Sequence, residues 1–232
     1  SLGVSFAIED GVTTTVAPAD STAIALDGRE TAFEPVSRLL EDLGVSATVA
    51  LESDLPVGRG FGASGAATLG TALAAAEVFD LDVDREELVD AAHRAELAAG
   101  TGQGDVFVQD VGGLVWNTGD GIGRRERTDP VAYSAFEDIA TADVLGDEAA
   151  LSRITAAGTD ALADFDPELP LDDWLPVSWA FATETGLVTE TVAETIDRVQ
   201  AAGGTATMAM VGETVIGTGR TDVLEEQTDI TP

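Results

Sequence analysis

The stretch of this sequence with the clearest chemical character is rich in glycine and runs from Pro56 to Ala67. Glycines allow backbone N–H groups to approach an anion closely, and a helix that starts after such a loop points its positive end at the same place. Apolar residues spaced for one helix face follow at once, at Ala66, Leu69, Leu73 and Ala76. The segment therefore predicts an anion-binding loop before a helix, and the alternative is a tight turn before an alanine-rich helix.

Two other phosphate-binding patterns compete for this loop. Gly60 to Gly65 fits GxGxxG, and Asp80 or Asp82 follows at about the distance that a dinucleotide site requires. That pattern keeps an NAD(P)-dependent oxidoreductase as an alternative, although Glu52–Val57 separates the expected strand from the first glycine. The P-loop is excluded because it needs a lysine after its last glycine, and the chain has no lysine.

Charge restricts the partners of the protein. The 232 residues include 43 acidic residues and 11 basic ones, all arginine, for a net charge of −32. Nucleic acid and anionic membrane surfaces are therefore excluded as partners, because both require a basic patch. A lysine-free acidic surface suits a cytosol that holds molar salt, where carboxylates are screened from one another. We expect a salt-accumulating, halophilic source, and an ordinary acidic protein is the alternative.

Residue types that are scarce exclude further chemistry. Cysteine is absent, so the chain has no disulfide and no thiol nucleophile, and the single histidine, His93, excludes a multi-histidine metal centre. The least polar stretch, Gly62 to Phe79, is too weakly apolar for a membrane span, and no secretory signal is visible. We expect a soluble, cytoplasmic protein. Because the sequence starts at Ser1 without Met, we also expect that an N-terminal piece is missing.

The hydrophobic pattern predicts a mixture of strands and helices around the loop. A turn signal at Glu9–Gly11 predicts a hairpin, and two capping boxes are expected, Thr31 with Glu34 and Asp84 with Glu87. Expected strands are Leu2–Ile8, Val12–Ala17, Thr22–Leu26, Val45–Leu51, Leu114–Asn117, Val131–Ile139, Thr205–Val211 and Thr214–Gly217. Expected helices are Thr31–Leu43, Ala66–Phe79, Asp84–Ala99, Asp147–Ala163, Leu171–Thr185 and Thr189–Ala202.

These elements predict an α+β protein with two lobes. Residues 1–130 would form an N-terminal lobe with a mixed sheet, helices and the glycine-rich loop, and residues 131–232 a C-terminal α/β lobe. Gly119–Arg127, which is polar and rich in glycine and arginine, is the expected linker.

The whole glycine-rich stretch resembles the second motif of the GHMP kinases (the galactokinase, homoserine kinase and mevalonate kinase superfamily), roughly P-x-G-x-G-L-G-S-S-A-A. Phe61 stands for the leucine and Ser64 for the second serine. Three further segments, Ala92–Glu96, Gly100–Val106 and Met208–Val215, are similar to the archaeal pantoate kinase branch. The resemblance implies a two-lobed GHMP-kinase-like fold and an ATP-dependent kinase that phosphorylates the terminal hydroxyl of pantoate in coenzyme A biosynthesis.

The resemblance also implies how ATP and Mg²⁺ are held. Ser64 and Glu96 match the family's magnesium site and carry the hard oxygen atoms that Mg²⁺ prefers. The nucleotide would lie on the loop, at Gly58, Gly60, Phe61, Gly62, Ala63, Ser64, Gly65 and Ala66.

Catalytic and substrate-binding roles follow from the same resemblance. Asp105 matches the aspartate that orients or deprotonates the acceptor hydroxyl, beside Glu96 and Ser64 as the other catalytic residues. His93, Thr141 and Arg59 are the expected substrate contacts. A substrate carboxylate must be held by arginine or backbone N–H groups, and the nearest arginines in sequence are Arg59, Arg94, Arg124 and Arg125.

Alternatives remain for the function and the assembly. Another GHMP kinase, of homoserine or mevalonate type, fits the loop equally well, and a catalytically silent binding protein on the same fold is a further alternative. Retention of Ser64, Glu96 and Asp105 argues against a silent protein. The sequence does not fix the oligomeric state, and a homodimer is one alternative.

Overall fold

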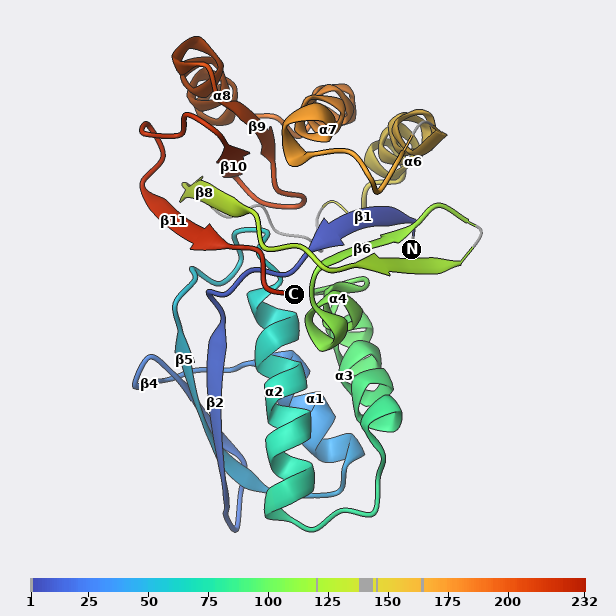
Figure 1. Cartoon of the computed structure of the whole chain (residues 1–232). Coiled ribbons are helices and arrows are strands. Elements are labelled where there is room, and N and C mark those ends of the chain that lie inside the picture. The colour runs from blue at the N-terminus through green and yellow to red at the C-terminus, as the bar shows by residue number, and fades with distance from the viewer. Residues whose placement is uncertain (1, 120, 138–143, 145, 164) are drawn as a thin grey trace. The chain divides into compact units, whose positions relative to one another are not determined.

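The computed structural model describes residues 2–119, 121–137, 144, 146–163 and 165–232 (Figure 1). The chain forms two compact units, each assembled from separate segments. One contains Asp10–Val57 and Gly62–Asp110, and the other contains Ser1–Glu9, Gly58–Phe61 and Val111–Pro232. We call them the helix-backed unit and the C-terminal unit. The α+β class is confirmed, whereas the single boundary near residue 130 stays a prediction.

The helix-backed unit is a four-stranded mixed sheet with helices on one face (Figure 1). The strand order is β2-β5-β3-β4, in which β2 and β5 are antiparallel and β3 and β5 are parallel. The four strands are β2 (Val12–Pro18), β3 (Ala23–Leu26), β4 (Arg29–Glu30) and β5 (Ala47–Ser53). The helices are α1 (Glu34–Asp42), α2 (Ala63–Val78), α3 (Arg85–Ala99) and α4 (Asp105–Val111).

Apolar side chains on one face of this sheet position helix α2, which carries the candidate site. Val16, Val49 and Leu51 of the sheet share a buried cluster with Ala67 and Ala75 of α2. A second cluster joins α2 to α3 and includes Leu69, Leu88 and Val106. Burial of this apolar area is the main stabilising term, and it fixes the start of α2 beside α3 and α4.

In its described residues, the C-terminal unit has two antiparallel sheets with helices beside them (Figure 1). The first has the order β1-β6-β7, with β1 (Gly3–Phe6), β6 (Leu114–Asn117) and β7 (Ile122–Arg125). The second has the order β11-β8-β10-β9, with β8 (Pro130–Ala135), β9 (Thr205–Met208), β10 (Thr214–Thr218) and β11 (Glu226–Asp229). The helices are α6 (Glu148–Ala163), α7 (Leu171–Thr185) and α8 (Glu190–Ala202), and α7 and α8 pack on the second sheet.

Two local predictions near the N-terminus are wrong. β1 and β2 do not form a hairpin, because β1 pairs with β6 and all seven residues of β2 pair with β5. The capping box of Thr31 and Glu34 is also absent, since Phe33 is the N-cap of α1 without a side-chain cap bond. The Thr31 N–H instead donates to the Ile24 carbonyl at 3.0 Å, which continues the β3–β4 pairing. The second capping box, Asp84 with Glu87, is confirmed at the start of α3.

Other differences concern glycine-rich and polar segments. The expected linker contains β7, which pairs with β6, and the Trp116 ring occupies the space beside Gly123. Helix α2 begins at Ala63 rather than at residue 66. Helix α4 and strand β11 were not expected, because α4 is short and begins directly after glycines, while β11 is a polar edge strand. β8 ends at Ala135, and Ile139 lies outside the described residues.

Candidate active site

The glycine-rich loop ends in a helix start that no side chain caps. Gly58, Gly60 and Gly62 have φ angles of +85°, +87° and +70°, which residues with a side chain rarely adopt. Gly62 is the N-cap of α2 and makes no side-chain cap bond. The first N–H groups of α2 therefore lack a capping side chain, and they can donate to an anion at the positive end of the helix.

The first half of the loop lies against the β9–β10 connection within the C-terminal unit. A Cβ at Gly60 would lie 3.0 Å from the Ala209 carbonyl oxygen, and one at Gly212 would overlap the Arg59 carbonyl. The Thr214 hydroxyl donates to that same Arg59 carbonyl at 2.7 Å. The segment Met208–Val215, singled out in the sequence, therefore fixes the path of the backbone at residues 59–60.

Phe61 directs its side chain into the C-terminal unit. Its ring meets Tyr133 of β8 edge-on, with ring centroids 4.7 Å apart. The phenyl ring therefore anchors the loop, and the backbone N–H is the part of Phe61 left to serve as an anion donor.

The second half of the loop lies against α4 within the helix-backed unit. A Cβ at Gly62 would lie 2.9 Å from Gln109 Nε2 and 3.0 Å from Asp105 Cβ, and one at Gly65 would lie 3.0 Å from Gln109 Oε1. Gln109 Nε2 donates to the Gly62 carbonyl at 2.8 Å. Glycine at these two positions lets α4 approach the start of α2, and that approach places Asp105 beside the helix terminus.

Glu96 of α3 is a buried carboxylate held by three hydroxyl groups. It is 1% exposed. Its Oε1 accepts hydrogen bonds from Ser64 Oγ at 2.9 Å and Thr68 Oγ1 at 2.7 Å, while its Oε2 accepts from Thr101 Oγ1 at 2.7 Å. Ser64 and Glu96, predicted as a pair from the family motif, are thus in direct contact.

Asp105, the first residue of α4, lies near the same carboxylate. Glu96 Oε2 and Asp105 Oδ2 lie 3.0 Å and 3.3 Å from the point where a Cβ on Gly102 would stand. Burial raises the pKa of Asp105, and the negative charge of Glu96 raises it further. In the described part of the chain, neither carboxylate forms an ion pair with an arginine. A buried acid beside a half-buried one is costly unless a cation or a proton joins them.

The donor set fits a magnesium ion. Mg²⁺ uses hard oxygen ligands and takes one or two carboxylates from a protein, together with phosphate oxygens and water. Glu96, Asp105 and the Ser64 hydroxyl offer such atoms around Gly102 and the start of α2. Among the described residues, no three His, Cys, Asp or Glu side chains gather into a metal cluster, so a dedicated all-protein cage is not found there.

His93 lies one turn before Glu96 on α3 and packs against a neighbouring ring at a tilted angle. Its imidazole contacts Phe107 of α4 with centroids 4.7 Å apart. Its Nδ1 is buried and has no hydrogen-bond partner among the residues that the structure describes. Burial lowers the pKa of His93, against the opposing charges of Asp90 and Glu96. A neutral imidazole with one unpaired nitrogen is suited to a hydrogen bond with a bound molecule.

The other expected substrate contacts are less closely defined. Thr141 lies outside the described residues. Arg94 is exposed on α3, and Arg59 is half-buried. Arg124 donates to the carbonyls of Val111 and Gly112, and Arg125 pairs with Glu168. The last two guanidinium groups therefore have partners within the protein.

Sequence reasoning missed Thr68, Thr101 and Gln109. Thr68 lies four residues after Ser64 on α2, so both hydroxyls face α3, and this spacing was the available signal. Thr101 and Gln109 carried no comparable signal, because their contacts depend on the turn after α3 and on the unexpected helix α4.

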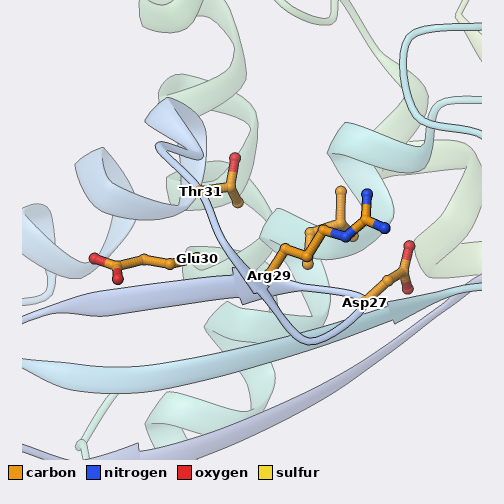
Figure 2. A pocket seen from close by; sticks show the side chains of 5 residues that line it. Asp27, Arg29, Glu30 and Thr31 are labelled. Atoms are coloured by element: carbon orange, nitrogen blue, oxygen red, sulfur yellow. The ribbon is translucent and has the colours of Figure 1, made fainter.

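A separate hollow lies at the β3–β4 turn, far from these residues in sequence. Figure 2 shows it lined by Asp27, Arg29, Glu30 and Thr31, with Leu26 as the fifth lining residue. Asp27 Oδ1 accepts a hydrogen bond from the Ser53 N–H at 3.1 Å, so this carboxylate joins the ends of β3 and β5. The remaining charged side chains are exposed, and the hollow contains none of the predicted site residues.

Comparison with known proteins gives a consistent result. Residues 30–113 match the GHMP kinases N terminal domain. The chain is 29% identical over 188 residues to a pantoate kinase of Methanospirillum hungatei, which covers 78% of this chain and 63% of that protein. It is 27% identical to a pantoate kinase of Methanocaldococcus jannaschii, over 78% of this chain and 68% of that protein. The chain thus spans less than two thirds of the first relative.

Solved structures agree on the fold. A phosphotransferase related to the CoA biosynthesis pathway superposes with a TM-score of 0.82 at 20% identity, over 99% of this chain and 87% of that one. Mevalonate kinase of L. major in complex with R-mevalonate gives 0.71 at 12% identity, over 99% and 89%. The chain has the fold of these kinases, and residues 30–113 match the model of the GHMP kinases N terminal domain. The predicted resemblance is confirmed.

No helix in the described part of the chain is long and apolar enough to cross a membrane.

Proposed function

We propose that this protein is an ATP- and Mg²⁺-dependent kinase that phosphorylates the terminal hydroxyl of pantoate, giving 4-phosphopantoate for coenzyme A biosynthesis. The observation that carries the proposal is that the buried Glu96 carboxylate accepts a hydrogen bond from Ser64 at the uncapped start of α2, with the half-buried Asp105 near the same carboxylate. The relatives named pantoate kinase supply the acceptor. The mixed sheet around β5 argues against the dinucleotide alternative, which requires a parallel sheet.

The nucleotide would lie on the loop. Backbone N–H groups from Gly58 to Ala66 would surround the phosphates, and the positive end of α2 would favour their charge. Ser64 and Glu96 would hold Mg²⁺, which when bound supplies neutralisation of the phosphate charge.

Asp105 would act on the acceptor. Its carboxylate would accept the proton of the pantoate hydroxyl as the hydroxyl oxygen bonds to the γ-phosphorus and the bond to ADP breaks. The environment that raises the pKa of Asp105 makes it a stronger base than an exposed carboxylate. His93, Thr141 and Arg59 are proposed as acceptor contacts, and His93 would use its unpaired Nδ1. We also propose a cytoplasmic location, because the proposed reaction consumes ATP.

An acceptor screen tests the proposal. ADP production is measured in molar KCl with pantoate, homoserine, mevalonate and galactose. We expect pantoate to exceed each of the others by more than about tenfold in kcat/KM, because each complementary contact missing from an analogue lowers transition-state binding. Equal turnover with homoserine or mevalonate would retain the superfamily and discard pantoate. A nicotinamide absorbance change without ADP would instead support the oxidoreductase.

The acidic composition predicts a requirement for salt, and we propose a halophilic source on this basis. The 43 acidic side chains repel one another across a Debye length of about 30 Å at 0.01 M salt, which shrinks to about 3 Å at 1 M. We therefore expect the fold to loosen at low ionic strength. Thermal melts in about 10 mM and about 2 M KCl, followed by circular dichroism, measure the effect, because the charges are weakly screened in the first and strongly screened in the second. If the melt at low salt is as cooperative as the melt at high salt and has the same midpoint temperature, a halophilic source is contradicted.

A further inference from the structure

The carboxylate of Glu96 has more hydroxyl donors than the proposed magnesium site requires. Ser64 is the family's magnesium-site serine by resemblance, yet Oε1 also accepts from Thr68 and Oε2 accepts from Thr101. Both oxygens of one buried carboxylate are therefore engaged, by hydroxyl groups from two different segments, helix α2 and the turn after α3. A side chain with both oxygens engaged has little rotational freedom about its last bond.

Thr68 is placed to act on Glu96 and not only on its own helix. Its hydroxyl has one proton and lies 2.7 Å from Glu96 Oε1 and 2.9 Å from the Ser64 carbonyl. The carboxylate is the stronger acceptor, so the Thr68 hydroxyl donates its hydrogen bond mainly to Glu96. Thr68 is fully buried, at 0% exposure, so water cannot replace its hydroxyl.

Thr71, on the same helix, has a hydroxyl that forms a hydrogen bond within that helix. It is also 0% exposed, and its hydroxyl donates to the Ala67 carbonyl at 2.7 Å, one turn earlier. It forms no bond to α3 among the contacts described. Thr71 is therefore a matched control for Thr68, with the same residue type, helix and burial.

We infer that Thr68 and Thr101 are positioning residues that hold the Glu96 carboxylate in one orientation, with Oε1 beside Ser64 and Oε2 beside Asp105. The inference rests on the proposed function, because it assumes that Glu96 serves a divalent ion. Thr101 is exposed, so water can partly replace its hydroxyl. Thr68 is therefore the stronger of the two constraints.

The test compares Thr68→Val, Thr101→Val, Thr68→Ser and the control Thr71→Val, with Thr101→Val as the deciding variant if Thr68→Val does not fold. We expect Thr68→Val to raise the half-saturating Mg²⁺ concentration about 10–100-fold, the usual result of removing a hydrogen bond that orients a metal ligand. Thr101→Val should raise it less, Thr71→Val should leave it unchanged, and Thr68→Ser should restore it because the hydroxyl remains. The KM for the acceptor should not change in any variant.

A readout without turnover separates this inference from the choice of acceptor. Mn²⁺ binding in the presence of ADP, followed by electron paramagnetic resonance, should weaken in the same order, even if pantoate is not the substrate. Denaturant midpoints show whether each variant folds. If Thr68→Val does not fold, the Mn²⁺ affinity of Thr101→Val is compared with that of Thr71→Val instead. The inference is overturned if Thr68→Val binds Mn²⁺ as Thr71→Val does, if Thr68→Ser fails to restore binding, or if the wild type with ADP binds no Mn²⁺.

Discussion

Asp105→Asn is expected to lower kcat by about 10²–10⁴-fold, the usual contribution of a general base. The amide keeps the shape of the side chain but cannot accept the proton of the acceptor hydroxyl. Affinity for ATP should stay near wild type, because the N–H groups of the glycine-rich loop are untouched. The measurement is kcat together with ATP binding by calorimetry.

Asp110→Asn is the control for that substitution. Asp110 belongs to the same short helix but pairs with Arg85 at 2.7 Å. We expect its kcat to match wild type. If kcat of Asp105→Asn stays within about threefold of wild type, well short of the range for a general base, Asp105 is only the first residue of α4. If ATP binding collapses instead, Asp105 belongs to the nucleotide or metal site, and His93 becomes the next candidate for activating the hydroxyl.

Gly62→Ala is expected to lower kcat/KM about 10²-fold, since a displacement near 1 Å at a reacting group has effects of that size. The new Cβ would lie 3.0 Å from Asp105 Cβ and 2.9 Å from Gln109 Nε2, so α4 must shift. The left-handed backbone, with φ of +70°, adds about 1–2 kcal/mol of strain.

Gly44→Ala separates those two effects. Gly44 has the same φ of +70°, and nothing lies within 4 Å of its Cβ position. Both variants should therefore lose similar backbone stability in denaturant melts, but only Gly62→Ala should lose activity beyond that. Equal activities in the two variants would show that the approach of α4 to the loop does not position Asp105.

The periodic elements and the site motif could be predicted because their signals are local. The capping box of Asp84 and Glu87 and the helix that follows the glycine-rich loop need no knowledge of distant segments. Ser64, Glu96 and Asp105 were predicted only through the family motif. Glu96 alone resembles any helix acid in so acidic a chain, and its burial depends on Thr68 and Thr101.

Features that depend on distant pairing could not be predicted in the same way. The turn residues Glu9–Gly11 lie between β1 and β2, yet these strands pair with partners about 110 and 30–40 residues away, in β6 and β5. Helix α4 has seven residues, too few for a clear periodicity, and it forms against Gly62 and Gly65. The position of Asp105 beside Glu96 thus depends on tertiary structure. The sequence contributes to it mainly through glycine at positions 62 and 65, where α4 approaches the start of α2.

The most direct test of the central claim is product analysis by ³¹P NMR, with ATP, Mg²⁺ and pantoate in molar KCl. We predict a phosphomonoester signal coupled to the protons of the terminal CH₂ of pantoate, appearing in step with ADP. Consumption of ATP with only inorganic phosphate as product, or no consumption of ATP by the folded protein, would contradict the assignment of this chain as a pantoate-phosphorylating kinase.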